Sequence, residues 1–122
     1  MIYLLDAGHG GMIGGVYQTP GKRSPVWGDM PQLFEGVFNR EIVSMLHDAL
    51  GKAGISSIVM VPEQRDVRLY DRVIRVNALA AKTKVILLSM HANAGGGTGW
   101  EAWTSIGDTK SDHLVNYFYD EM

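Results

Sequence analysis

Two histidines in this chain each stand at the downstream end of a short apolar run, and imidazole nitrogens are good metal ligands. His9 follows the run at residues 2–6, and His91 follows the run at residues 85–90. Apolar runs of this length predict buried strands. Because ligands bind at the carboxyl ends of strands in an open parallel sheet, we expect the two imidazoles to meet at one edge.

A carboxylate would complete this candidate metal site, and the sequence favours Glu35. It lies between a long irregular segment and a helix, where its side chain can reach the edge of the sheet. Two imidazoles and one carboxylate can hold Zn²⁺ and leave its fourth position open. Such an ion activates water and polarises a carbonyl, which is the chemistry of metal-assisted hydrolysis. The chain has no cysteine, so any metal must be held by nitrogen and oxygen.

Polar residues before each histidine are expected to support the site. Asp6 and Ser89 are candidates to orient the imidazoles by accepting hydrogen bonds. The glycine-rich segment 8–11 has a second reading, as a tight turn or a weak phosphate-binding loop that lacks the Lys-Ser/Thr of a P-loop. The chain would then be a metal-free α/β ligand-binding domain. His47 and His113 are expected on the surface.

The elements that must position these residues alternate as strand, helix, strand, helix, strand. This order predicts an α/β fold with a parallel sheet. Strands are expected at residues 2–6, 55–61 and 84–90, an additional one can form at 100–105, and helices are expected at 38–52, 67–82 and from 111 onward. Residues 8–33 are expected to be an irregular functional segment, and 94–99 a glycine-rich turn.

Apolar periodicity predicts which face of each helix points to the sheet. In the first helix these residues are Ile42, Val43, Leu46, Ala49 and Leu50. In the second they are Leu69, Val73, Val76 and Ala80, with Ile74 at the margin.

Composition predicts one globular domain, spanning residues 1–122. The chain is 46% hydrophobic and 20% charged, which is too apolar for a disordered chain. Its net charge is -2 and it has no basic run, so nucleic acid is not an expected partner. No apolar stretch has the length of a membrane span. The N-terminus leads straight into the first expected strand, so we expect no signal peptide in this chain.

Several motifs together resemble the zinc-dependent N-acetylmuramoyl-L-alanine amidases of group 3, found in cell-wall hydrolases and phage endolysins. The motifs are Asp6-Ala7-Gly8-His9-Gly10-Gly11, Glu35 with Asn39, Leu69 and Arg72 with Asn77, Ser89-Met90-His91-Ala92-Asn93-Ala94, and Gly99-Trp100-Glu101. The resemblance implies an α/β three-layer sandwich around a mostly parallel sheet. It also implies zinc ligands at His9, Glu35 and His91. The implied reaction is cleavage of the amide between N-acetylmuramic acid and L-alanine in peptidoglycan.

Two departures from this family are visible. The segment between His9 and Glu35 is longer than usual, and we expect it to form a lid or a specificity element. The family's catalytic glutamate lies on a later strand, and no such motif occurs before Met122. We therefore expect the catalytic domain to be incomplete at its C-terminal end and the general base to be a glutamate beyond Met122. Glu101 is the only in-chain residue that the motif pattern offers as a substitute.

The resemblance leaves two functional readings beside the metal-free one. The first is a hydrolase that acts on the cell wall, either in the periplasm or outside the cell, or as a phage endolysin released from the cytoplasm. The second is a zinc-containing peptidoglycan-binding module without hydrolytic activity.

Overall fold

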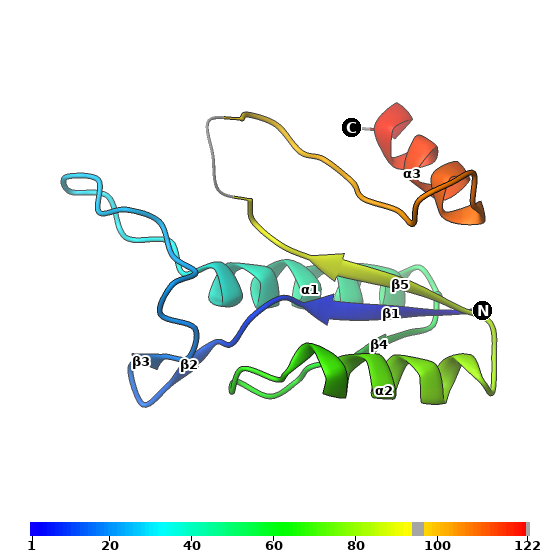
Figure 1. Ribbon diagram of the computed structural model, residues 1–122, viewed down its shortest axis with the longest axis horizontal. Coiled ribbons are helices and arrows are strands. Elements are labelled where there is room, and N and C mark those ends of the chain that lie inside the picture. The colour runs from blue at the N-terminus through cyan, green and yellow to red at the C-terminus, as the bar shows by residue number, and fades with distance from the viewer. Residues whose placement is uncertain (94–96, 122) are drawn as a thin grey trace.

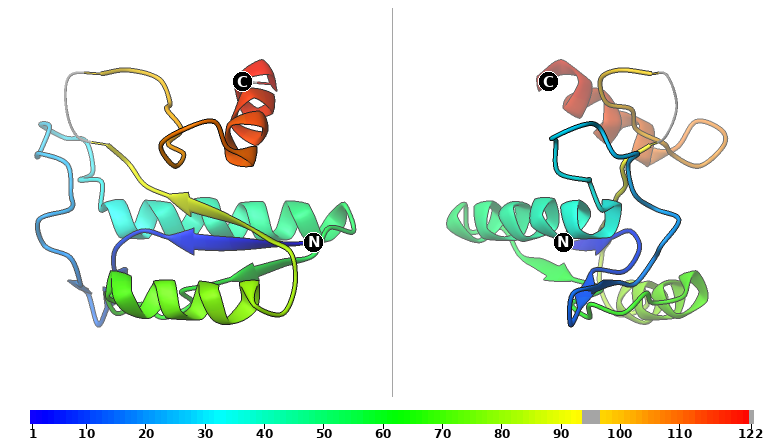
Figure 2. Two further views of the ribbon diagram at one scale, coloured as in Figure 1. Left: turned by 45° about the vertical axis from the view of Figure 1, so that its right-hand side comes forward. Right: turned by 90° about the vertical axis from the view of Figure 1, so that its left-hand side faces the viewer.

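Three parallel strands form the central sheet in the order β4–β1–β5. They are β1 (Ile2–Ala7), β4 (Ser57–Val59) and β5 (Val85–Met90). The computed structural model describes residues 1–93 and 97–121. Helix α1 (Glu35–Lys52) and helix α2 (Leu69–Ala80) lie on opposite sides of this sheet (Figures 1 and 2). The predicted α/β three-layer sandwich is therefore confirmed.

The core lies on both faces of β1, because successive side chains of a strand point to opposite faces. Leu4 and Leu5 are both fully buried. Leu4 packs in a cluster with Val76 of α2, and Leu5 packs in a second cluster with Val43 of α1. A strand covered on both faces reads as a continuous apolar run, which is why β1 was predictable from sequence.

Strands β1 and β5 end in step, and this register brings the two histidines together. Ala7 is paired with Met90 at the last position of the ladder. The backbone N–H of Gly8 then donates to the carbonyl oxygen of Met90 at 3.0 Å. His9 and His91 consequently leave the sheet at the same edge, as expected of parallel strands.

The predicted irregular segment contains structure that periodicity did not indicate. Strands β2 (Met12–Ile13) and β3 (Val16–Tyr17) form a two-stranded hairpin. Its turn residues, Gly14 and Gly15, have φ values of 55° and 78°, which glycine adopts without strain. Further along, isolated bridges join Arg23 to Phe34 and Trp27 to Met30, so this part projects as a narrow ribbon (Figure 1).

The larger differences from the predicted elements concern the second strand, the first helix and residues 100–105. The second strand is limited to Ser57–Val59: the backbone N–H of Met60 still donates to the carbonyl oxygen of Leu5 at 2.8 Å, but the chain bends there into the following loop, with Met60 and Val61 buried. Helix α1 begins at Glu35 rather than residue 38. Residues 100–105 are not a strand: within the described residues they pair with no other strand, and Trp100 instead stacks on Tyr119 at 4.4 Å.

Helix α3 (Lys110–Glu121) lies apart from the sheet, beyond β5 (Figure 1). It begins one residue before the predicted position. The predicted glycine-rich turn at 94–99 falls partly on residues 94–96, which lie outside the described residues.

The predicted inward face of α2 is wrong in part. Val76 does pack on the core, but Leu69 and Val73 are 75% and 46% exposed. The residue that faces the sheet one turn before Val76 is Arg72, which is buried. Helix α2 is therefore turned so that Arg72, rather than Leu69 and Val73, faces the sheet. There Arg72 forms a buried ion pair with Asp6, and this pair stabilises the orientation because a charge buried without a partner would be strongly unfavourable.

Candidate metal centre

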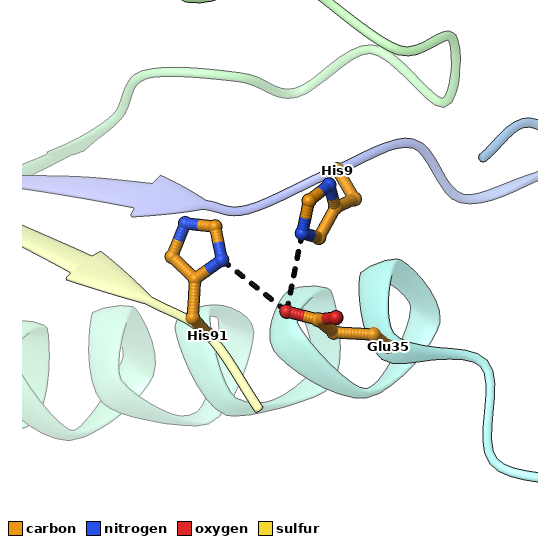
Figure 3. A group of neighbouring side chains, drawn as sticks. All are labelled: His9, Glu35 and His91. Carbon is orange, nitrogen blue, oxygen red and sulfur yellow. Dashed lines mark hydrogen bonds and ion pairs between the residues drawn. The ribbon is translucent and has the colours of Figure 1, made fainter. Parts of the chain in front are cut away.

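Three side chains that are far apart in the sequence meet at the carboxyl edge of the sheet. His9 follows β1, His91 follows β5, and Glu35 is the first residue of α1. His9 Nε2 and His91 Nδ1 each lie 3.2 Å from the same carboxylate oxygen, Oε1 of Glu35. Figure 3 shows both imidazoles turned toward this carboxylate. The structure thus brings together the three residues that the sequence selected.

The two separations from the Glu35 oxygen fit a tetrahedral zinc ion. One nitrogen or oxygen atom from each residue lies within 4.8 Å of the others. Ligand bonds of about 2.05 Å arranged tetrahedrally would place any two ligand atoms about 3.4 Å apart. The two distances of 3.2 Å to Glu35 are close to that value. Two nitrogen donors and one carboxylate are also a donor set that zinc accepts, so the residues fit the ion.

The three side chains differ in their exposure to solvent. The side chain of Glu35 is 10% exposed, that of His9 is 19% exposed and that of His91 is 47% exposed. The side of the group that carries His91 is therefore the one most accessible to solvent, and Glu35 is the most buried of the three. The two rings stand perpendicular, with centroids 5.0 Å apart, so neither one covers the other.

Burial lowers the pKa of His9 below the usual histidine value, with further lowering by His91 and Lys22. The Glu35 carboxylate opposes this shift but is the smaller influence. Because a metal binds the neutral imidazole, a lowered pKa keeps His9 in its binding form further into the acidic range.

Two glycines allow this close assembly. A Cβ atom on Gly8 would overlap the imidazole ring of His91, and one on Gly36 would overlap the carbonyl group of Gly10. Gly8 therefore lets the His91 ring cross the end of β1. Gly36 lets the first turn of α1 approach the loop that carries His9, which brings Glu35 into reach.

The first turn of α1 is held where Glu35 is needed. The backbone N–H of Gly36 donates to the Tyr17 hydroxyl at 2.8 Å, and that hydroxyl donates to the carbonyl oxygen of Lys22. A carboxylate at the N-terminus of a helix is also favoured by the helix dipole. Glu35 Oε1 in addition accepts a hydrogen bond from the backbone N–H of Ala92 at 3.1 Å, which ties the carboxylate to the segment after β5.

Asp6 and Ser89 do not act as predicted. Instead of accepting from an imidazole, the Asp6 carboxylate accepts from Arg72 Nη1 and from the Ser89 hydroxyl, each at 2.7 Å. The reason is geometric: Asp6 is inside β1 and its side chain points toward α2, whereas His9 lies beyond the end of the strand. Asp6 and Ser89 therefore join the ends of β1 and β5, and they support the site through the backbone.

Glu101 lies outside the three-residue group. It is exposed, and its carboxylate accepts a hydrogen bond from the side-chain amide of Asn93, two residues beyond His91. His47 and His113 are exposed, as predicted, and His47 forms a hydrogen bond with Ser57 rather than joining the site.

Sequence reasoning missed Arg40, which reaches the backbone on both sides of the candidate centre. Its Nη1 donates to the carbonyl oxygens of His9 at 2.8 Å and Gly36 at 2.9 Å. Helical spacing was the available signal, since Arg40 lies between Gly36 and Val43 on the inward face of α1. Its partner, the His9 carbonyl, is 31 residues away in the sequence and gave no local sign.

Comparison with protein-family models matches residues 4–122 to the group 3 family described as N-acetylmuramoyl-L-alanine amidase. No curated protein and no solved structure matches the chain. Across residues 1–93 and 97–121, none of the helices combines the length and apolar character needed to cross a membrane.

Proposed function

Because the chain belongs to the N-acetylmuramoyl-L-alanine amidase family, we propose that it hydrolyses the amide bond between N-acetylmuramic acid and L-alanine in peptidoglycan, using a zinc ion held by His9, Glu35 and His91. The observation that supports this most directly is the convergence of two imidazole nitrogens on one carboxylate oxygen at 3.2 Å. In the proposed setting the substrate lies on the cell wall, either in the periplasm or outside the cell, or is reached by a phage endolysin.

The chain's own residues prepare this chemistry. Burial lowers the pKa of His9 and so favours its neutral, metal-binding form, and the Ala92 N–H donates a hydrogen bond that orients the Glu35 carboxylate. When bound, zinc would supply the Lewis acidity that polarises the scissile carbonyl and lowers the pKa of water. The partly exposed His91 faces the side from which the substrate enters.

A proton acceptor is also required, and we propose Glu101 for this role within the chain. Its carboxylate is accessible to solvent, and Asn93 gives it a fixed partner close to His91 in the sequence. A general base takes the proton of the attacking water and returns it to the leaving amine. The L-alanine amino group then leaves as a neutral amine.

A second candidate function is peptidoglycan binding without hydrolysis. The observation that favours it is the position of Glu101, which is bonded to Asn93 and is not among the three clustered ligands. In this case the metal centre would hold the muramyl peptide without cleaving it.

The test is to incubate purified cell walls with the chain plus Zn²⁺ and, separately, with a chelator. The expected result is zinc-dependent loss of turbidity with release of new L-alanine amino groups. His9→Ala should abolish both signals. His47→Ala is the matched control, because that histidine is exposed and bonded to Ser57, and it should retain activity. Glu101→Gln should lose activity while still binding zinc.

The outcomes separate the candidates. Co-sedimentation with cell walls without any release of amino groups supports the binding module. Equal activity with zinc and with chelator refutes the metal-dependent mechanism. Full activity of Glu101→Gln removes Glu101 as the proton acceptor.

A further inference from the structure

The backbone of His9 has an unusual conformation. Its φ is 64°, and within residues 1–93 and 97–121 it is the only residue other than glycine with a positive φ. An L-residue in this region is less stable than in an ordinary conformation and persists only where its surroundings hold it. The same backbone conformation turns the imidazole toward Glu35 (Figure 3).

Two arginines donate hydrogen bonds to the same backbone atom of His9. The carbonyl oxygen of His9 accepts hydrogen bonds from Arg40 Nη1 at 2.8 Å and from Arg72 Nη2 at 3.2 Å. On the preceding residue, the carbonyl oxygen of Gly8 accepts from Asn39 Nδ2 at 3.2 Å. Hydrogen bonds from a charged donor are stronger than neutral ones, so these contacts can hold the strained conformation.

Arg40 differs from Arg72 because it also holds the segment that carries Glu35. The Nη1 atom that donates to His9 donates to the carbonyl oxygen of Gly36 at 2.9 Å, and Nη2 donates to the carbonyl oxygen of Glu63 at 2.7 Å. Gly36 is the residue next to Glu35. One guanidinium therefore joins the backbone of one candidate ligand to the neighbour of another.

The surroundings of Arg40 are partly unfavourable for its own side chain. Its Nε atom is buried and has no hydrogen-bond partner among the described residues. Burial and the charge of Arg72 both lower the pKa of Arg40. An orphaned donor and a neighbouring like charge oppose this arrangement, so its three carbonyl contacts must outweigh them.

We propose that Arg40 is a positioning residue of the metal centre, which fixes the separation of His9 and Glu35 before any metal binds. Its planar fork donates in fixed directions, which a flexible ammonium group does not reproduce. The inference rests on the proposed function, because it assumes that these residues bind zinc. Arg40 itself touches neither metal nor substrate in this proposal.

The test measures the zinc affinity of the whole chain by competition with a chromophoric chelator. Loss of a group that orients metal ligands typically weakens binding roughly 10- to 100-fold, and we expect a loss in this range for Arg40→Gln. Arg40→Lys keeps the charge but not the fork and should fall between Arg40→Gln and the unaltered chain. The visible spectrum of the Co²⁺-loaded chain should also change in Arg40→Gln, because it reports ligand geometry.

Arg75→Gln is the matched control. Arg75 bonds to the carbonyl oxygen of Met60 and to the Glu63 carboxylate, and so lies next to the Arg40 network without touching the segments that carry the ligands. It should lower the melting temperature of the metal-free chain and leave zinc affinity and the Co²⁺ spectrum unchanged.

Several results would overturn the inference. Arg40→Gln could bind zinc within about twofold of the unaltered chain, or Arg75→Gln could weaken binding equally. If Arg40→Gln does not fold, an unchanged affinity and spectrum in Arg40→Lys would have the same meaning. Absence of zinc binding by the unaltered chain would remove the proposed function as well, whereas zinc binding without wall hydrolysis would leave the positioning role intact.

Discussion

Replacing Asp6 by asparagine should destabilise the chain because it removes the nearer and more buried negative partner of a buried arginine. Arg72 and Asp6 are each 7% exposed, and Arg72 Nη1 lies 2.7 Å from Asp6 Oδ1. Asparagine keeps the shape of the side chain but leaves the guanidinium with only the more exposed Asp66 carboxylate, 3.8 Å away, as a charged partner. Breaking a buried ion pair in this way costs about 3–5 kcal/mol.

The lower end of that range is the better expectation for this site. Arg72 also donates to the carbonyl oxygens of Val67, Ala7 and His9, and these contacts remain in the variant. For a chain of 122 residues, an unfolding entropy of about 2.1 cal/mol/K per residue converts a loss of about 3 kcal/mol into a fall of about 12 °C in melting temperature.

Asp71→Asn provides the comparison, because it removes an acid from an exposed pair on the same helix. Arg68 and Asp71 are 3.0 Å apart, but the Arg68 side chain is 81% exposed. Such pairs contribute about 1 kcal/mol or less. The expected fall is below about 4 °C, measured for both variants by thermal and urea unfolding with a chelator present.

Equal losses in the two variants would refute the reasoning. They would mean that water screens the pair of Asp6 and Arg72 as fully as the exposed pair. The rotation of α2 that buries Arg72 would then need another cause.

Three further outcomes are expected. Zinc at 100 times its dissociation constant should stabilise the chain by about 2.7 kcal/mol, and thus raise its melting temperature by about 10 °C; an unchanged melting curve would contradict the metal site. Gly8→Ala should weaken zinc binding because its Cβ would displace the His91 ring, whereas Gly21→Ala, with open space around its Cβ, should not. The hydrogen bonds from Arg75 lower the pKa of Glu63 from 4.5 to about 2, so this pair stabilises the chain above pH 4.5 and the effect is lost as pH falls toward 2. Glu63→Gln should remove about 1 kcal/mol at pH 7 and almost nothing at pH 2, measured by urea unfolding.

The sheet and the two histidines could be predicted because their signals are local. β1 and β5 are short apolar runs, and parallel strands must end at a common edge. The choice of Glu35 was also within reach of sequence, since it precedes an apolar helical pattern. The sequence did not indicate that Glu35 is the first residue of α1. The start of this helix is held by the hydrogen bond from the Gly36 N–H to the Tyr17 hydroxyl, which joins positions 19 residues apart.

The strand predicted at 100–105 shows the opposite case. Aromatic and β-branched residues favour strands, but a strand also needs a neighbour with which to pair. In the described part of the chain, Trp100 packs on Tyr119 instead. Residues 100–105 thus have the local preference for a strand, but no neighbouring strand pairs with them within the described residues.

The sequence by itself determined which residues we propose for the chemistry, because their types and their places after apolar runs leave few alternatives. Only the tertiary structure decided how those residues are held. The contacts of Arg72 with Asp6, and of Arg40 with the His9 carbonyl, join positions 66 and 31 residues apart. Periodicity records which face of a helix is apolar, but the partner of a buried charge depends on which distant segment the fold brings beside it.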